Sequence, residues 1–293
     1  MSVSSEYASA TLAAAPRAEG VRLRWSVVLH YLVLLIMSVV ILMPLYVMVS
    51  TSFKTQIDIT ASEPVWIFQP TMANYEDILT RQRFDRFLVN SVLTALFSTA
   101  ATLIAGSMAA FAIARMQFPG RGLLAQTTLL IRMVPAAVLA IPIFALWLEW
   151  GIEDGRIGLV LFYTALNLPF AIWLLIGFIK QVPVELEEAA IVDGAGAFQV
   201  FFRILFPILR PGLAVASIFT FRIAWNEFIL ALILTNRMTR TLPVATTLYI
   251  TDQGVEWGRI MAMGTLMVVP PLLLTFVAAR QIIAGLTAGA VKG

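Results

Sequence analysis

The chain contains six long apolar runs, and each is long enough to cross a lipid bilayer as a helix. An α-helix rises about 1.5 Å per residue, so about 20 residues cover the roughly 30 Å hydrocarbon core. Because lipid offers the backbone no hydrogen-bond partner, such runs fold as helices. The sequence therefore predicts an all-α integral membrane protein with six spans: 25–49, 87–114, 123–148, 157–179, 204–234 and 260–283.

Composition limits the kind of chemistry that this chain can perform. Hydrophobic residues make up 60% of its 293 residues and charged residues only 13%, whereas soluble domains carry about a quarter charged residues. The formal net charge of +3 is too small to indicate nucleic-acid binding and fits the basic flanks of membrane spans. With no cysteine, one histidine (His30) and no GxxxxGK[ST] phosphate loop, we expect no catalytic residue, no metal and no cofactor bound by this chain.

The regions outside the spans suggest how the chain is divided. Residues 1–20 are rich in alanine and serine and predict a flexible tail. Arg22 and Arg24 then precede an apolar run that is too long for a signal peptide, so we expect an uncleaved first span. Residues 21–284 are expected to form the membrane domain, with residues 285–293 as a C-terminal tail.

The polar loop 183–203, before the fifth span, has the signals of a short helix that ends in a turn. Pro183 can open a helix, and Glu185, Glu187 and Glu188 then lie where the helix dipole favours negative charge. Gly194 and Gly196 permit a backbone turn. Two interpretations are open at this point: an ordinary amphipathic interfacial helix, or a lever that a soluble partner grips.

The spacing in this loop resembles the Glu-Ala-Ala (EAA) loop in permease subunits of ATP-binding-cassette (ABC) importers. The family pattern places glycine, isoleucine and proline at fixed distances after Glu-Ala-Ala. The positions of this chain that match are Glu188, Ala189, Ala190, Gly194, Ile204 and Pro207. Phe206 stands where the family usually has leucine, which keeps an apolar residue before the proline.

Further segments are similar to the carbohydrate-uptake, maltose-type branch of these importers. They are Thr51-Ser52-Phe53-Lys54, Asn74-Tyr75, Phe87-Leu88-Val89-Asn90-Ser91, Trp225-Asn226-Glu227-Phe228 and the C-terminal segment 285–293. This resemblance implies a type I importer permease fold with a cytoplasmic coupling helix, in the bacterial inner membrane. It also implies coupling residues in the loop, which are Glu187, Glu188, Ala189, Ala190, Asp193, Gly194 and Gly196.

The resemblance also implies an assembly. We expect a second permease subunit that is a different chain, two ABC ATPase subunits that use ATP and Mg²⁺, and an extracytoplasmic sugar-binding protein. The loop between the fifth and sixth spans, residues 235–258, would probe that binding protein. Membrane lipid is the remaining expected partner, and charge alone gives only a weak positive-inside bias for the orientation.

Polar residues within spans are costly and usually face a cavity or one another. The candidates for a substrate path are Arg132, Asn167, Arg222, Trp225, Asn226 and Glu227. Trp225 to Glu227 offer an aromatic face and hydrogen-bonding groups within one helical turn, which suits a sugar. The structural alternative is that Arg132 or Arg222 neutralises Glu227 while Asn226 bonds a neighbouring helix.

Two rival functions differ in what they require. A stand-alone secondary transporter or channel for a small polar solute would work without an ATPase. An intramembrane enzyme would need an acid–base or nucleophile set that the sequence does not offer. The sequence favours a permease subunit that moves a sugar or sugar derivative and is driven by partner ATPases.

Overall fold

The computed structural model describes residues 25–81, 83–152 and 154–290 of the chain. The expected tail 1–20 and the last three residues lie outside these ranges. The chain divides into two units at Val47 and Met48. The first unit is most of helix α1 (Trp25–Ser52), whose apolar side chains are exposed along its length, from Trp25 at 81% to Tyr46 at 56%. An apolar helix surface of this kind is suited to lipid or to another subunit.

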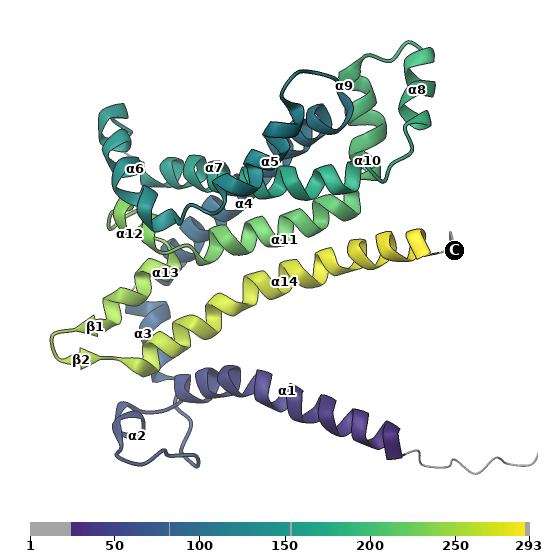
Figure 1. Cartoon of the computed structure of the whole chain (residues 1–293). Helices are drawn as coiled ribbons and strands as arrows, with labels where there is room; N and C mark the ends of the chain where they lie inside the picture. The colour runs from purple at the N-terminus through teal and green to yellow at the C-terminus, as the bar shows by residue number, and fades with distance from the viewer. Residues whose placement is uncertain (1–24, 82, 153, 291–293) are drawn as a thin grey trace, which may run out of the picture. The chain divides into compact units, whose positions relative to one another are not determined.

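The second unit is built around four helices (Figure 1). They are α4 (Phe84–Arg115), α7 (Gly155–Ile179), α11 (Arg210–Asn226) and α14 (Trp257–Ala290). Helix α4 packs along α7, and α11 packs against α4, α7 and α14. Helix α14 is longer than the expected sixth span, because it continues as a helix to Ala290, into the segment expected to be a tail.

In the described part of the chain, four helices are long and apolar enough to cross a membrane, and there are up to six spans if two bent helix pairs are each counted as one. The expected third span, 123–148, is present as a bent pair of helices rather than as one straight helix. It is α5 (Arg121–Ile131) and α6 (Ala136–Trp150), bent by 100°. Pro135 lies between them, and since proline disfavours helical backbone in the residue before it, α5 ends and α6 begins again on the other side.

The expected fifth span, 204–234, is also interrupted. A helical arm precedes it, made of α9 (Ala197–Gln199), a π-helical turn η1 (Val200–Leu205) and α10 (Phe206–Ile208). This arm meets α11 at an angle of 77°, next to Pro211 in the first turn of α11. The chain leaves helical geometry again at Glu227 and resumes as α12 (Ile229–Leu234).

The remaining elements lie at the two ends of this unit (Figure 1). At one end, α8 (Glu185–Val192) and the arm α9–α10 form what we call the elbow. The other end, which we call the hairpin end, contains the shorter elements. They are α2 (Gln56–Thr60), α3 (Ala73–Arg81), α13 (Leu242–Ala245), the 3₁₀ turn η2 (Thr246–Tyr249) and the strands β1 (Ile250–Thr251) and β2 (Gly254–Val255).

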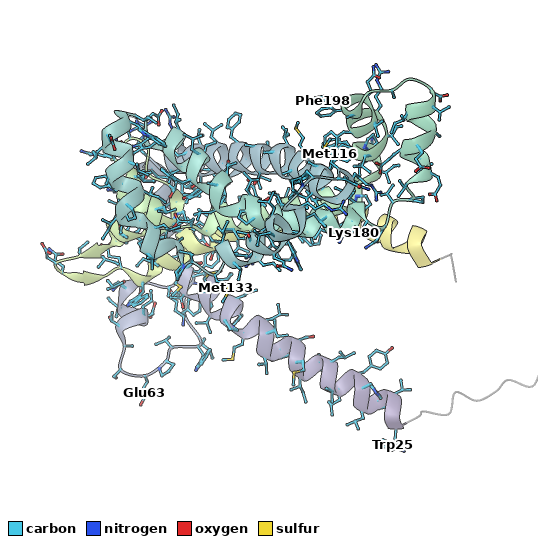
Figure 2. The ribbon with its side chains drawn as sticks, turned by 45° about the horizontal axis from the view of Figure 1, so that its top comes forward. Trp25, Glu63, Met116, Met133, Lys180 and Phe198 are labelled. Carbon is cyan, nitrogen blue, oxygen red and sulfur yellow. The ribbon has the colours of Figure 1, made fainter. Side chains whose placement is uncertain are left out.

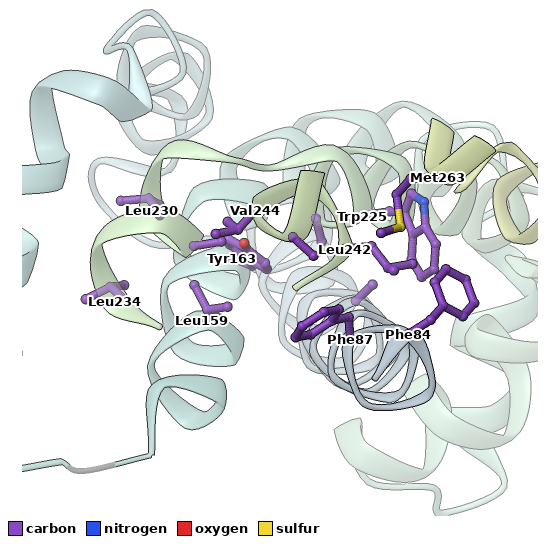
Figure 3. Close-up of a cluster of buried hydrophobic side chains, with 14 of the residues drawn as sticks. Phe84, Phe87, Leu159, Tyr163, Trp225, Leu230, Leu234, Leu242, Val244 and Met263 are labelled. Atoms are coloured by element: carbon purple, nitrogen blue, oxygen red, sulfur yellow. The ribbon is translucent and has the colours of Figure 1, made fainter. Parts of the chain in front are cut away.

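A cluster of buried apolar side chains lies near each of these two ends. The larger joins α4, α7, α11, α12, α13 and α14 near the hairpin end, and Figure 3 shows Phe84, Phe87, Leu159, Tyr163 and Trp225 within it. The second joins α4, α7, η1 and α10 beside the elbow, with Leu175, Ile179 and Leu205 completely buried. The strands β1 and β2 pair antiparallel, Ile250 with Val255 and Thr251 with Gly254, and are a small addition to the expected all-α fold.

Candidate functional sites

The elbow contains the short helix and the turn that the sequence predicts. Helix α8 has three glutamates in its first turn and ends at Val192. Gly194 then adopts a φ of +85°, in the left-handed region that favours glycine. The N–H of Ala195 donates to the carbonyl of Ala190 at 2.9 Å, so the turn satisfies a carbonyl at the helix end. Gly196 has ordinary extended backbone and instead begins α9, where its N–H donates to Oε1 of Gln199.

One ion pair fastens α8 to the membrane helices. Nε of Arg115, the last residue of α4, lies 2.7 Å from Oε1 of Glu187, and both side chains are largely buried. Nη2 of the same guanidinium donates to the carbonyls of Ile179, at 2.9 Å, and Val182, at 2.6 Å. Arg115 therefore joins the end of α4, the end of α7 and the start of α8.

The rest of the elbow surface is exposed. Glu188, Ala189, Asp193, Gly194 and Gly196 are exposed and Ala190 is half-buried. Among the apolar residues, Ile191 is 60% and Val192 is 87% exposed. Of the predicted coupling residues, only Glu187 therefore faces inward.

Behind the arm, an apolar cavity of about 180 Å³ separates α9 from α4. Phe198 and Met116 both line it, and Figure 2 shows them at the elbow end of the molecule. Phe201, in η1, packs against Phe111 of α4 at 5.5 Å between ring centroids. The arm thus contacts α4 through aromatic side chains, while α8 contacts α4 through Arg115.

Trp225 and Glu227 are neighbours in sequence, but their side chains reach different elements. Trp225 is buried, its indole N–H donates to the carbonyl of Met267 at 3.0 Å, and its ring stacks on Phe221. Glu227 accepts hydrogen bonds from the N–H groups of Leu230 and Ala231, at 2.9 and 3.0 Å. Its carboxylate also accepts from the hydroxyl of Tyr163 in α7 at 2.9 Å. Glu227 therefore caps α12 and ties it to α7.

The structure leaves both arginines away from Glu227. Within the described ranges, neither Arg132 nor Arg222 forms an ion pair with Glu227, so the structural alternative in which one of them neutralises Glu227 is not observed. Neutral donors at the start of α12 and the Tyr163 hydroxyl hold the carboxylate instead. Asn167 is buried and donates to the carbonyl of Tyr163 within α7.

The other polar candidates lie on exposed surface. The guanidinium of Arg132, at the break between α5 and α6, lies 4.2 Å from the ring centroid of Phe170 in α7. Phe170 in turn meets Phe219 of α11 at 5.4 Å. Arg222 and Asn226 follow on α11, both exposed, with the amide of Asn226 donating to the carbonyl of Arg222. Cation, aromatic rings and amide thus occur along one stretch of α11 and its neighbours.

Comparison with known proteins identifies the family. The model of the family described as "binding-protein-dependent transport system inner membrane component" matches residues 101–287. The chain belongs to this family. As such it is a multi-pass permease of the bacterial inner membrane, in agreement with its apolar membrane-spanning helices.

Individual relatives cover most of the permease. It is 38% identical to the diacetylchitobiose uptake system permease protein DasC of Streptomyces coelicolor, over 85% of this chain and 91% of that protein. The trehalose transport system permease protein SugB of Mycobacterium tuberculosis is 38% identical over 76% of this chain and 82% of its own. The sulfoquinovosyl glycerol transport system permease protein SmoH of Agrobacterium fabrum is 34% identical over 83% of this chain and 86% of its own.

A solved structure shares the fold. A chain in the crystal structure of a bacterial ABC transporter involved in the import of alginate, an acidic polysaccharide, superposes with a TM-score of 0.74. The match covers 88% of this permease and 96% of that chain at 20% sequence identity. This confirms the expected importer permease fold.

Sequence reasoning missed three residues that the geometry brings forward. Nothing in the sequence singles out Arg115 among the basic residues that flank the spans, because its partner Glu187 lies 72 residues away. Phe170 and Phe219 were indistinguishable from other apolar residues in their spans. The available sequence signal for Arg115 is its position. It is a charged residue at the very end of a span, and the loop that follows contains no acidic residue.

Proposed function

We propose that this permease moves a sugar or sugar derivative across the inner membrane. The named relatives are permeases for diacetylchitobiose, trehalose and sulfoquinovosyl glycerol, and the alginate importer shares the fold. These cargoes differ in charge and size but are all carbohydrates or their derivatives. An extracytoplasmic binding protein would deliver the sugar, and a second permease subunit would complete the channel.

The elbow is the proposed contact with the ATPase subunits, and the Arg115–Glu187 pair is the observation that carries this proposal. A lever needs a firm attachment on one side and a free surface on the other. Glu187 provides the attachment to α4 and α7, while Glu188, Ala189, Ile191 and Val192 lie on the exposed surface. Force applied to α8 would therefore pass through Arg115 into two membrane helices at once.

We place ATP hydrolysis, with its Mg²⁺, in the partner ATPases. The elbow then lies in the cytoplasm and the hairpin end on the extracytoplasmic side. Under this arrangement the C-terminal segment 285–293 approaches the ATPase pair, and residues 235–258 face the binding protein. The remaining coupling residues, Asp193, Gly194 and Gly196, would shape the turn that the ATPase surface meets.

The proposed sugar path runs along the exposed stretch of Arg132, Phe170, Phe219, Arg222 and Asn226. Guanidinium and amide groups can hydrogen-bond sugar hydroxyls, and an aromatic face suits the apolar side of a sugar ring. Trp225, Glu227 and Asn167 contribute differently, since their polar atoms already have partners in the permease. They would hold the path's walls in position.

Copurification tests the assembly. The permease is purified from its native membrane with its associated chains, which mass spectrometry identifies, and is then reconstituted in proteoliposomes. We expect an ABC ATPase, a second permease and a binding protein, with sugar uptake that requires ATP inside the vesicle. Uptake that persists without any ATPase and follows an ion gradient would overturn the proposal in favour of a secondary transporter.

A further inference from the structure

Four arginines gather around one pocket at the hairpin end of the permease. Arg83 and Arg86 come from the start of α4, and Arg237 and Arg240 come from the connection between α12 and α13. The pocket encloses about 600 Å³. The other described lining residues are apolar, and none is acidic: Phe87, Met238 and Leu248.

The two segments that carry these arginines are held together by Asn90 and Ser91. The amide of Asn90 donates to the carbonyls of Met238 and Arg240, both at 3.0 Å. The N–H of Leu242 donates to Oγ of Ser91 at 2.8 Å. Both side chains are buried, so the arginines project from a fixed backbone rather than from two independent loops.

The chain compensates only part of the charge of this pocket, through the carboxylate of Asp85, which acts on both Arg83 and Arg86. Arg83 pairs with Asp85 at 3.3 Å and Nη1 of Arg86 donates to Sδ of Met238 at 2.8 Å, but Arg86, Arg237 and Arg240 form no ion pair within the described part of the chain. Nε of Arg240 is buried and has no hydrogen-bond partner. The N-terminus of α4 adds partial positive charge next to Arg83 and Arg86.

Other arginines at this end behave differently. Arg259 pairs with Asp77 at 3.1 Å and with Glu256, and Arg156 pairs with Asp154 at 2.6 Å. Like charges that share a cavity repel one another, and unpaired buried donors cost free energy. The pocket is therefore suited to carboxylate groups supplied from outside the chain.

The composition of the pocket favours a protein as the source of those carboxylates. Arginine and methionine are enriched at protein interfaces, whereas lysine is depleted. This pocket has four arginines, no lysine among its described lining, and Met238 at 58% exposure on its rim.

We propose that the arginine pocket receives acidic side chains of the extracytoplasmic solute-binding protein. The inference rests on the proposed function, which brings that protein to the hairpin end. Rim charges of this kind steer association and fix the register of docking. The pocket would thus select binding proteins by an acidic patch around the mouth of their ligand site.

The test uses the assembled importer in nanodiscs and the binding protein that copurifies with it, loaded with its sugar. ATP hydrolysis is measured against binding-protein concentration at about 50 mM and about 500 mM salt. For Arg237→Glu, and separately for the double variant Arg86→Gln/Arg240→Gln, we expect the half-saturating concentration to rise about ten-fold at low salt. High salt should weaken docking of the wild type and have less effect on the variants.

Arg156→Gln is the matched control, because it removes an arginine at the same end whose charge Asp154 already neutralises. Its half-saturating concentration should match the wild type. Unchanged docking in both pocket variants would overturn the inference, as would a pocket that binds sulfate or glucuronate tightly while docking stays unaffected. If the wild-type importer shows no stimulation by any binding protein, the proposed function fails instead, so the two failures are distinguishable.

Discussion

At the elbow, α8 is attached to the membrane helices by one guanidinium, whereas at the hairpin end several uncharged side chains bind one segment to another. Arg115 joins α8 to the ends of α4 and α7 by pairing with Glu187 and donating to the carbonyls of Ile179 and Val182. At the other end, Asn90 and Ser91 fix the connection after α12, and Asn74 donates to the carbonyls of Ser52 and Lys54.

The difference follows from what each end has to do in a driven transporter. A lever transmits force through a compact, strong contact and keeps its outer face free for the motor. A docking surface needs a shape that is set before the partner arrives, because a preorganised surface pays less ordering entropy on binding. The elbow therefore buries the Arg115–Glu187 pair and keeps Glu188 exposed, while the arginine pocket exposes the side chains of Arg83 and Arg237.

Reversing the charge of Glu188 is expected to have the largest effect on transport. Glu188 is exposed on α8, so Glu188→Lys should leave the permease folded and inserted. A reversed charge on a docking surface costs several kcal/mol, so ATP-driven uptake should fall by about two orders of magnitude. Uptake in proteoliposomes, together with the amount of ATPase that copurifies, measures the result. Normal uptake with normal ATPase recovery would remove α8 from the coupling contact.

Substitution of Glu187, next to Glu188, should reduce the stability of the permease. Glu187→Ala leaves Arg115 buried without its carboxylate, and breaking a buried pair costs about 3 kcal/mol. The thermal unfolding temperature of the detergent-solubilised permease should fall clearly, whereas Glu188→Ala should leave it nearly unchanged. Equal losses of stability in the two alanine variants would contradict the division between attachment and free face.

Much of this architecture could be predicted from the sequence because membrane insertion imposes strong local rules. The apolar runs predicted the class and, within the described residues, four unbroken spanning helices, α1, α4, α7 and α14, since lipid-exposed backbone must be helical. Within the elbow, the acidic first turn and Gly194 predicted a short helix and its end, and both are present. These signals act over a few residues, which is why one sequence is enough to recognise them.

What could not be predicted depends on contacts between distant residues. A proline such as Pro135 favours a kink, but the 100° bend between α5 and α6 depends on how they pack on α7 and α12. The pairing of Arg115 with Glu187 joins positions 72 residues apart, and no local pattern specifies it. Likewise, Trp225 and Glu227 lie within one helical turn in the sequence, which does not show that their side chains bond different residues, Met267 and Tyr163.

Asn90 provides the corresponding test at the hairpin end. Asn90→Ala removes the donor to the carbonyls of Met238 and Arg240 and leaves two acceptors near a buried site. We expect a loss of about 2 kcal/mol in unfolding free energy, less than for Glu187→Ala. Docking of the binding protein should weaken while ATPase recovery stays normal. Hydrogen exchange of residues 236–242 measures whether the connection has loosened, and unchanged protection there would show that other contacts hold it.

Substitutions of Glu227 should have the smallest effect on stability. They also test whether its carboxylate contacts the sugar or only positions α12. Its carboxylate accepts from two N–H groups at the start of α12 and from Tyr163, so Glu227→Ala should cost about 1 kcal/mol, as loss of a helix cap does. Glu227→Gln keeps an acceptor oxygen and should cost less. If Glu227 only positions α12, Tyr163→Phe will reproduce part of the loss and both variants will slow all sugars equally. A changed order of preference among several sugars in Glu227→Gln, with stability preserved, would instead place this carboxylate in contact with the cargo.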